Sequence, residues 1–184
     1  MPLFNGSFFG NGGDIIPVLN QVDADTDVTG DWINMSKYER VLFVVAKYGT
    51  EDVDTLGFEV VQATAAAGTG VKAVTALFPY WYKQGTLTSQ TVWTAGRLTT
   101  ADNILGIGSS APTGGTLVVA TDTNTDAAML AIEVQATDLD VDGGFDYATI
   151  RIEGDEVNNS CLVTVLAVLT GSRYPQTTPL SAIS

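Results

Sequence analysis

The apolar residues of this chain come in short runs that glycine, proline or aspartate interrupts before a helix of ordinary length can form. No window keeps apolar residues at helical spacing without meeting glycine or proline. Residues 59–77 contain enough alanine to suggest a helix, but Gly68 and Gly70 lie in that window, and each would cost about 1 kcal/mol inside a helix. We therefore expect two strands and a loop there. Valine, threonine and aromatic residues fill the runs, as is typical of strands.

The order of apolar and polar residues within each run predicts how the strands are buried. Residues 41–46 and 161–170 are apolar almost throughout, which is typical of strands that are buried on both faces. Residues 130–136 and 145–152 alternate apolar and polar side chains, the pattern of a half-buried strand. Pro79 would confine the end of the third strand to a sheet edge or a bulge. In chain order, the predicted strands cover residues 41–46, 57–63, 71–82, 86–94, 130–136, 145–152 and 161–170.

The size and composition of the chain indicate one folded domain. Hydrophobic residues make up 45% of the 184 residues and charged residues only 16%, which excludes intrinsic disorder and suits a single core. The predicted fold is all-β, a sandwich or jelly-roll-like barrel of about eight strands with extended N- and C-terminal arms. Residues 1–16 would form the N-terminal arm, 17–172 the β-sandwich domain and 173–184 the extended C-terminal tail. Residues 99–126, rich in threonine, glycine and serine, predict an inserted loop or hairpin.

Charge and missing residue types exclude several classes of function. Eight Lys and Arg against 21 Asp and Glu leave a net charge of −13, which repels a phosphate backbone, so we expect no nucleic-acid partner. The chain has no histidine, the commonest general base and metal ligand, so we expect no enzyme. The single cysteine, Cys161, lies in an apolar run, which favours a buried thiol. The longest apolar run is about half of a membrane span, so we expect no membrane partner, and the first residues lack a secretory signal pattern.

Three patterns resemble ligand sites, but their context argues against each one. Residues 138–142 place aspartates at alternate positions before a glycine, as in an EF-hand loop, but Thr149 stands where that loop needs a glutamate. The acidic cluster at 23–31 lacks the glycine of such a loop at the required position. Residues 106–111 match the dinucleotide pattern without the strand–helix unit that the pattern needs. We expect no cofactor and no metal; a calcium ion held by both acidic clusters at a subunit seam stays open.

Aromatic residues provide an alternative from another functional class. Tyr80, Trp81, Tyr82 and Trp93 are able to stack on sugar rings, which would make the protein a glycan-binding module. Aromatic residues on strands more often anchor a core or an interface. Pairs of carboxylates such as glycosidases use are unavoidable by chance among 21 acidic residues, so an enzyme is the least favoured of the alternatives.

Short motifs occur in a fixed order in the last third of the chain. They cover residues 132–136, 139–141, 144–147 (Gly-Phe-Asp-Tyr), 150–152, 163–169 and 172–175 (Ser-Arg-Tyr-Pro), and residues 30–33 with 38–45 precede them. This order resembles a family of small structural proteins encoded by tailed bacteriophages, over roughly half of the chain.

The resemblance implies a non-enzymatic virion protein, and within the virion it favours a capsid decoration or cement protein that binds the outside of the major capsid shell and stabilises it. A neck, tail or spike component is the alternative. The expected partners are the major capsid protein and further copies of the chain, as a dimer or trimer. The negative charge favours the outer surface of the head over its DNA-filled interior. The expected capsid or subunit contacts are Phe4, Phe8 and Phe9 of the arm and Arg173, Tyr174 and Leu180 of the tail; the alternative for the arm is packing on its own sandwich.

Overall fold

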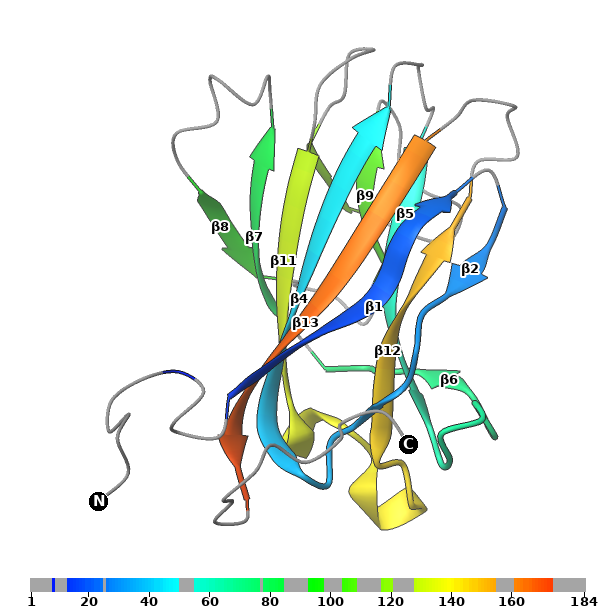
Figure 1. Ribbon diagram of the computed structural model, residues 1–184, viewed down its shortest axis with the longest axis vertical. Coiled ribbons are helices and arrows are strands. Elements are labelled where there is room, and N and C mark those ends of the chain that lie inside the picture. The colour runs from blue at the N-terminus through cyan, green and yellow to red at the C-terminus, as the bar shows by residue number, and fades with distance from the viewer. Residues whose placement is uncertain are drawn as a thin grey trace.

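In the computed structural model, the chain forms two β-sheets packed face to face (Figure 1). The structure describes Phe8 and residues 13–24, 26–49, 55–76, 78–84, 93–97, 104–108, 117–120, 128–154 and 161–173. The predicted all-β fold is confirmed. In the described part of the chain each sheet ends in edge strands, so the fold is a sandwich and not a closed barrel.

Sheet A has six strands in the order β1, β13, β4, β11, β7, β8. They are β1 (Asp14–Asp23), β4 (Tyr38–Gly49), β7 (Pro79–Gln84), β8 (Thr94–Arg97), β11 (Ala128–Gln135) and β13 (Cys161–Ser172). Sheet B follows the order β10, β9, β5, β12, β2, with β3 beside β12 and β6 beside β5. Its strands are β2 (Val28–Thr29), β3 (Ile33–Asn34), β5 (Thr55–Ala63), β6 (Lys72–Ala73), β9 (Ile104–Gly108), β10 (Leu117–Ala120) and β12 (Tyr147–Glu153).

The strands pair in the nested order of a jelly roll. β1 pairs with β13, β2 with β12, β4 with β11 and β5 with β9, and all four pairs are antiparallel. Early strands therefore pair with late ones, as in a long hairpin that is folded over to place its strands in two sheets. β7 and β8 extend sheet A beyond β11. The predicted jelly-roll-like arrangement is thus present in the form of a sandwich.

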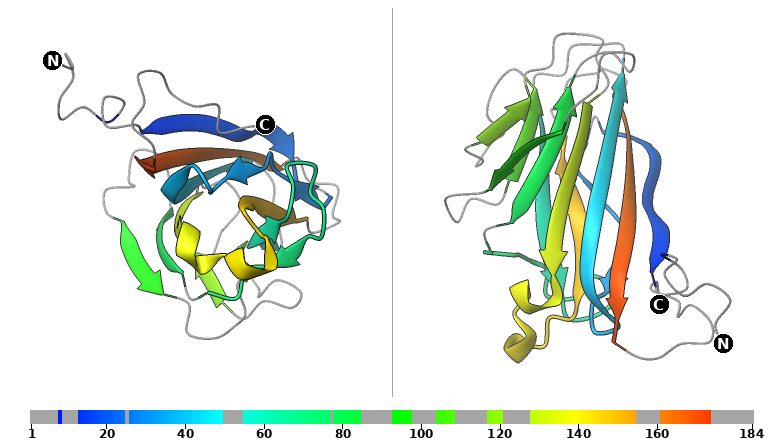
Figure 2. Two further views of the ribbon diagram at one scale, coloured as in Figure 1. Left: turned by 90° about the horizontal axis from the view of Figure 1, so that it is seen from below. Right: turned by 90° about the vertical axis from the view of Figure 1, so that its left-hand side faces the viewer.

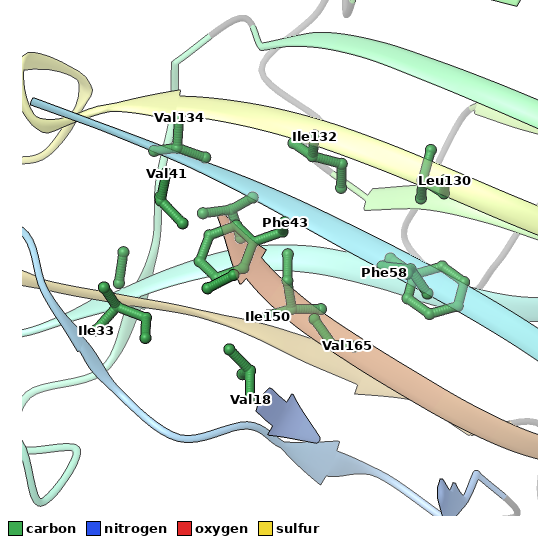
Figure 3. Close-up of a cluster of buried hydrophobic side chains, with 14 of the residues drawn as sticks. Val18, Ile33, Val41, Phe43, Phe58, Leu130, Ile132, Val134, Ile150 and Val165 are labelled. Carbon is green, nitrogen blue, oxygen red and sulfur yellow. The ribbon is translucent and has the colours of Figure 1, made fainter. Parts of the chain in front are cut away.

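The core lies between the sheets and is built from alternate residues of their strands. Phe43 of β4 in sheet A and Phe58 of β5 and Ile150 of β12 in sheet B all belong to this core, and all three are fully buried (Figure 3). Burying one such side chain contributes about 1.5–3 kcal/mol. The inward residues of one strand are two apart, so this core determines which residues point outward.

Two strands that were predicted to be buried on both faces are buried on one face only. In β13, Val163, Val165, Ala167 and Leu169 are buried, whereas Leu162 and Leu166 are each 37% exposed. Leu42, Val44 and Ala46 of β4 are only half-buried. The prediction was wrong because sheet B covers one side of sheet A, and these apolar residues point to the other side. The side chain of Cys161 lies outside the described residues.

The chain between β5 and β7 crosses from one sheet to the other. The two strands and a loop expected over residues 59–77 are present, since β5 ends at Ala63 and β6 begins at Lys72. The prediction of one continuous strand over 71–82 is wrong, because β6 belongs to sheet B and β7 belongs to sheet A. The crossing segment places Val74 and Phe78 in the core. Pro79 is the first residue of β7, a position that tolerates proline.

Three further segments differ from the prediction. The described part of residues 99–126 forms β9 and β10, which pair in parallel and therefore make neither a surface loop nor a hairpin. Leu105 of β9 is fully buried, which explains why this segment belongs to sheet B. β1 begins at Asp14 and takes the last residues of the expected arm, 1–16, into sheet A. The strand predicted over 86–94 overlaps β8 only at Thr94, where β8 starts, and residues 85–92 lie outside the described residues.

Candidate interaction surface

The outward-pointing side chains of sheet A, here called the outer face, are largely apolar. The right-hand view of Figure 2 looks onto this sheet. The strand registers place one row of side chains across all six strands, and every member of the row is apolar: Pro17, Leu166, Val44, Ala131, Trp81 and Ala95. Side chains directly opposite one another on neighbouring strands are in contact distance, so the row is a continuous apolar band.

Apolar residues continue on both sides of this row. Ile15, Val168 and Leu42 lie in line on one side, and Leu162 lies opposite Tyr48 near the other end of β13. Ile15 is 46% exposed and Tyr48 is 60% exposed. Single exposed apolar residues are common on protein surfaces, but a contiguous patch of this kind indicates a binding surface. The unbroken apolar runs in β4 and β13 were the sequence signal of this surface, and they were misinterpreted as burial within the domain.

The outer face is nearly neutral although the protein is strongly acidic. Its described charged side chains are three bases, Arg40, Lys83 and Arg97, and two acids, Asp23 and Glu133. Arg40 and Glu133 form an ion pair of 3.6 Å between neighbouring strands. The whole chain has 21 acidic residues against eight basic ones. Most of the acidic side chains that the structure describes therefore lie away from this face, which favours contact with another protein surface there.

The four aromatic residues proposed as a sugar platform divide between the two faces of the sheet. Tyr80 is buried, and Tyr82 also packs against the core. Trp81 belongs to the apolar row of the outer face, and the Lys83 Nζ atom lies 4.9 Å from the centre of the Trp93 ring. The division follows from the alternation of side chains along β7. Burial raises the pKa of the Tyr80 hydroxyl, and the neighbouring Tyr82 adds to the effect.

The predicted contact residues of the two arms are described in part. Phe8 is half-buried, its backbone oxygen accepts a 3.0 Å hydrogen bond from the Gly13 N–H, and its ring lies over Gly13. Arg173 is exposed, and its backbone N–H donates to the Lys37 oxygen at 3.0 Å. Phe4, Phe9, Tyr174 and Leu180 lie outside the described residues.

Both arms join sheet A at the same end. Asp14, the first residue of β1, pairs with Leu169, close to the last residue of β13. Because β1 and β13 are antiparallel neighbours, the start of one lies beside the end of the other (Figure 1). Phe8 and Arg173 are therefore attached at one edge of one end of the sandwich.

The aspartates that suggested a calcium loop serve as local hydrogen-bond acceptors. The Asp138 carboxylate accepts from the Gln135 N–H at 2.8 Å, and Asp140 accepts from the Gly143 N–H at 3.1 Å. Asp140 also pairs with the Lys72 Nζ atom at 2.5 Å. This hydrogen bond to Lys72, with the Gly143 bond second, lowers the pKa of Asp140 below its usual range. Among the described residues, no three His, Cys, Asp or Glu side chains are grouped to hold a metal ion.

A buried ion pair links β5 and β12 of sheet B. Glu59 and Arg151 are directly opposite one another and form a salt bridge. The Glu59 side chain is only 6% exposed and that of Arg151 is 37% exposed. Glu153 lies 3.9 Å from the same guanidinium. Burial raises the pKa of Glu153, and the nearby Glu59 carboxylate raises it further. The ion pair joins residues that are directly opposite one another and so holds β5 and β12 in register.

No protein-family model matches the chain, and no curated protein matches its sequence. In the part of the chain that the structure describes, no helix is long and apolar enough to cross a membrane.

Proposed function

We propose that this protein is a virion structural protein that decorates the outer surface of a tailed-phage head and stabilises the major capsid shell. The observation that carries the proposal is the junction of both arms at one end of the sandwich, where β1 starts beside the end of β13. The residues with which the sequence predicts contact to the capsid, Phe8 and Arg173 among them, are attached there. A compact domain with two attachment segments at one end is suited to bind neighbouring subunits of a larger assembly. Such binding stabilises the assembled shell by mass action.

The fold and the charge are consistent with this role. Jelly-roll sandwiches occur in viral capsid domains and in lectins, so the fold alone does not decide between binding to a shell and binding to a glycan. A net charge of −13 disfavours a place beside packaged DNA and leaves the outside of the head. The alternative within the virion is a neck, tail or spike component, which would use the same contacts in fewer copies.

The copy number of the protein in purified particles tests this proposal. Quantitative mass spectrometry against the most abundant shell protein should give on the order of hundreds of copies, as icosahedral symmetry requires of a shell component. About a dozen copies would assign the protein to the neck or tail, and its absence from particles would refute a virion role. Arg173→Ala should reduce binding to particles, whereas Val141→Ala, at an exposed residue outside sheet A, should not.

One observation favours glycan binding as a second candidate. Trp81 and Lys83 lie on the outer face, and the Lys83 Nζ atom is 4.9 Å from the centre of the exposed Trp93 ring; aromatic rings near a charged group offer an apolar face with polar surroundings to a sugar. Trp81→Ala would then abolish binding on a glycan array while the circular dichroism spectrum stays unchanged. Lack of binding of the wild-type protein to any glycan tested would refute this candidate.

A further inference from the structure

We propose that the outer face of sheet A packs against the same face of a second copy of this chain, which gives a two-fold symmetric dimer. This inference does not depend on the proposed virion role, because it rests on the sheet's own outward residues. The apolar row from Pro17 to Ala95 crosses all six strands. In the proposed dimer each row would meet its equivalent across the two-fold axis.

The outer face is large enough for a stable dimer. Six strands about 4.8 Å apart, with a stretch such as Leu162 to Thr170 at about 3.3 Å per residue, span at most about 24 by 27 Å, or about 650 Å² of flat sheet. This area is an upper limit, because β7 has six residues and β8 has four. A stable interface buries about 800 Å² on each partner, and the surface of real side chains exceeds that of a flat sheet. Ile15, Tyr48 and Leu166 of this face are apolar and exposed, and a contiguous exposed apolar patch indicates an interaction site.

Charge makes this face the favourable place for two identical acidic chains to meet. Two copies with a net charge of −13 each repel one another over most of their surfaces. The outer face carries three basic and two acidic side chains in its described strands, and Arg40 is paired with Glu133 within one chain. Association through this face therefore brings together two nearly neutral surfaces.

The β1 edge of sheet A is poorly suited to association with a second strand. β1 is the edge strand next to β13, and Pro17 in β1 has no N–H to donate. The pairing of β1 shifts register between Pro17 and Leu19 and again between Leu19 and Val22. Gln21 has a φ of 49°. Prolines and bulges of this kind prevent a second strand from adding to an edge.

A second copy fits the face better than an unrelated partner does. Closed two-fold dimers are the commonest assemblies of soluble proteins, and their interfaces use the same patch on both subunits. Two flat sheets pack face to face about 10 Å apart with their strands within about 30° of parallel. The outer face has the same twist in both copies, so two of these faces can pack in this way.

The test measures the mass of the full-length protein in solution over a dilution series, by light scattering and native mass spectrometry. We expect a species of twice 19.3 kDa that dissociates on dilution. Leu166→Lys introduces a cation into the middle of the apolar row in each subunit, and it should raise the dissociation constant at least about 100-fold. Val141→Lys is the matched control, because Val141 is 53% exposed and lies outside sheet A; it should leave the dimer intact.

A second variant and a spectroscopic measurement cover the case in which Leu166→Lys does not fold. Leu162→Lys, nearer the start of β13, should also give monomers with an unchanged circular dichroism spectrum. The fluorescence of Trp81 should shift to shorter wavelength as wild-type protein is concentrated, and the shift should be absent in Trp81→Phe. A wild-type monomer at every concentration would overturn the proposal and would point to a different partner or to the N-terminal arm as the cover of this face. An oligomer that both lysine variants leave intact would place the interface elsewhere and would equally refute it.

Discussion

Replacing Arg151 by methionine should destabilise the protein by about 3 kcal/mol, the low end of the cost of breaking a buried ion pair. The Glu59 side chain is 6% exposed and would keep its negative charge without a partner. Glu153 is 3.9 Å from the same guanidinium, so the substitution leaves two carboxylates facing each other. We take the low end because Arg151 is 37% exposed and solvent weakens its attraction to Glu59.

The complementary variant should behave differently. Glu59→Gln leaves the partly exposed Arg151 with access to water and with Glu153 nearby, so it should cost only about 1 kcal/mol. In the double variant Glu59→Gln with Arg151→Met the buried charge is gone, and part of the lost stability should return. Urea unfolding followed by tryptophan fluorescence, at one fixed protein concentration, measures all three free energies. If Glu59→Gln costs more than Arg151→Met, the assignment of Glu59 as the more deeply buried partner is refuted.

Three other substitutions test the core, a glycine with left-handed backbone in β13 and a titrating group. Phe43→Ala should lower the free energy of unfolding by about 3–5 kcal/mol because Phe43 is fully buried between the sheets; a loss below about 1 kcal/mol in the same urea assay would contradict the core described above. Gly171→Ala should cost about 1–2 kcal/mol, since Gly171 of β13 has a φ of +68° and its new Cβ would lie 2.7 Å from Glu39; an unchanged melting temperature would argue against this left-handed backbone conformation. Burial, and then Glu59, raises the pKa of Glu153 in the folded state. Ionisation of Glu153 therefore destabilises the folded state as the pH rises from the ordinary pKa of glutamate towards this raised pKa. Glu153→Gln should therefore raise the melting temperature at pH 7 and leave it unchanged at about pH 3.5, where the carboxyl is protonated in both states; an equal change at both values would exclude the pKa as the cause.

The sequence was sufficient to predict an all-β sandwich and most of its central strands. The alternating pattern of residues 130–136 predicted β11, and the apolar run around Phe43 predicted β4, because period and composition are local properties. The break between β6 and β7 was missed, since nothing local to residues 71–82 shows that the chain changes sheets there. β9 was missed because Leu105 lies among glycine and threonine residues that favour a loop, and its burial against β5 is a long-range effect.

The interaction surface was harder to predict than the fold. The apolar runs of β4 and β13 are equally expected for a strand covered on both sides by its own domain and for one covered by a second molecule. Only the strand registers reveal that Leu166, Val44 and Trp81 fall in one row on the face of sheet A that sheet B does not cover. Which of the aromatic residues of β7 are buried was not predictable for a related reason, because the face of each depends on which residue of β7 is the first to point inward.

The nested strand order has a consequence for how the protein is synthesised. β13 lies between β1 and β4 in sheet A, although it is made long after both of them. Until β13 has emerged from the ribosome, β1 has no partner among the described strands, and β4 has a free edge on that side. The nascent chain therefore carries open strand edges for most of its translation, and such edges invite pairing with other chains. Slowing translation just before residue 161 should increase aggregation of the product, whereas slowing it after residue 173 should have little effect.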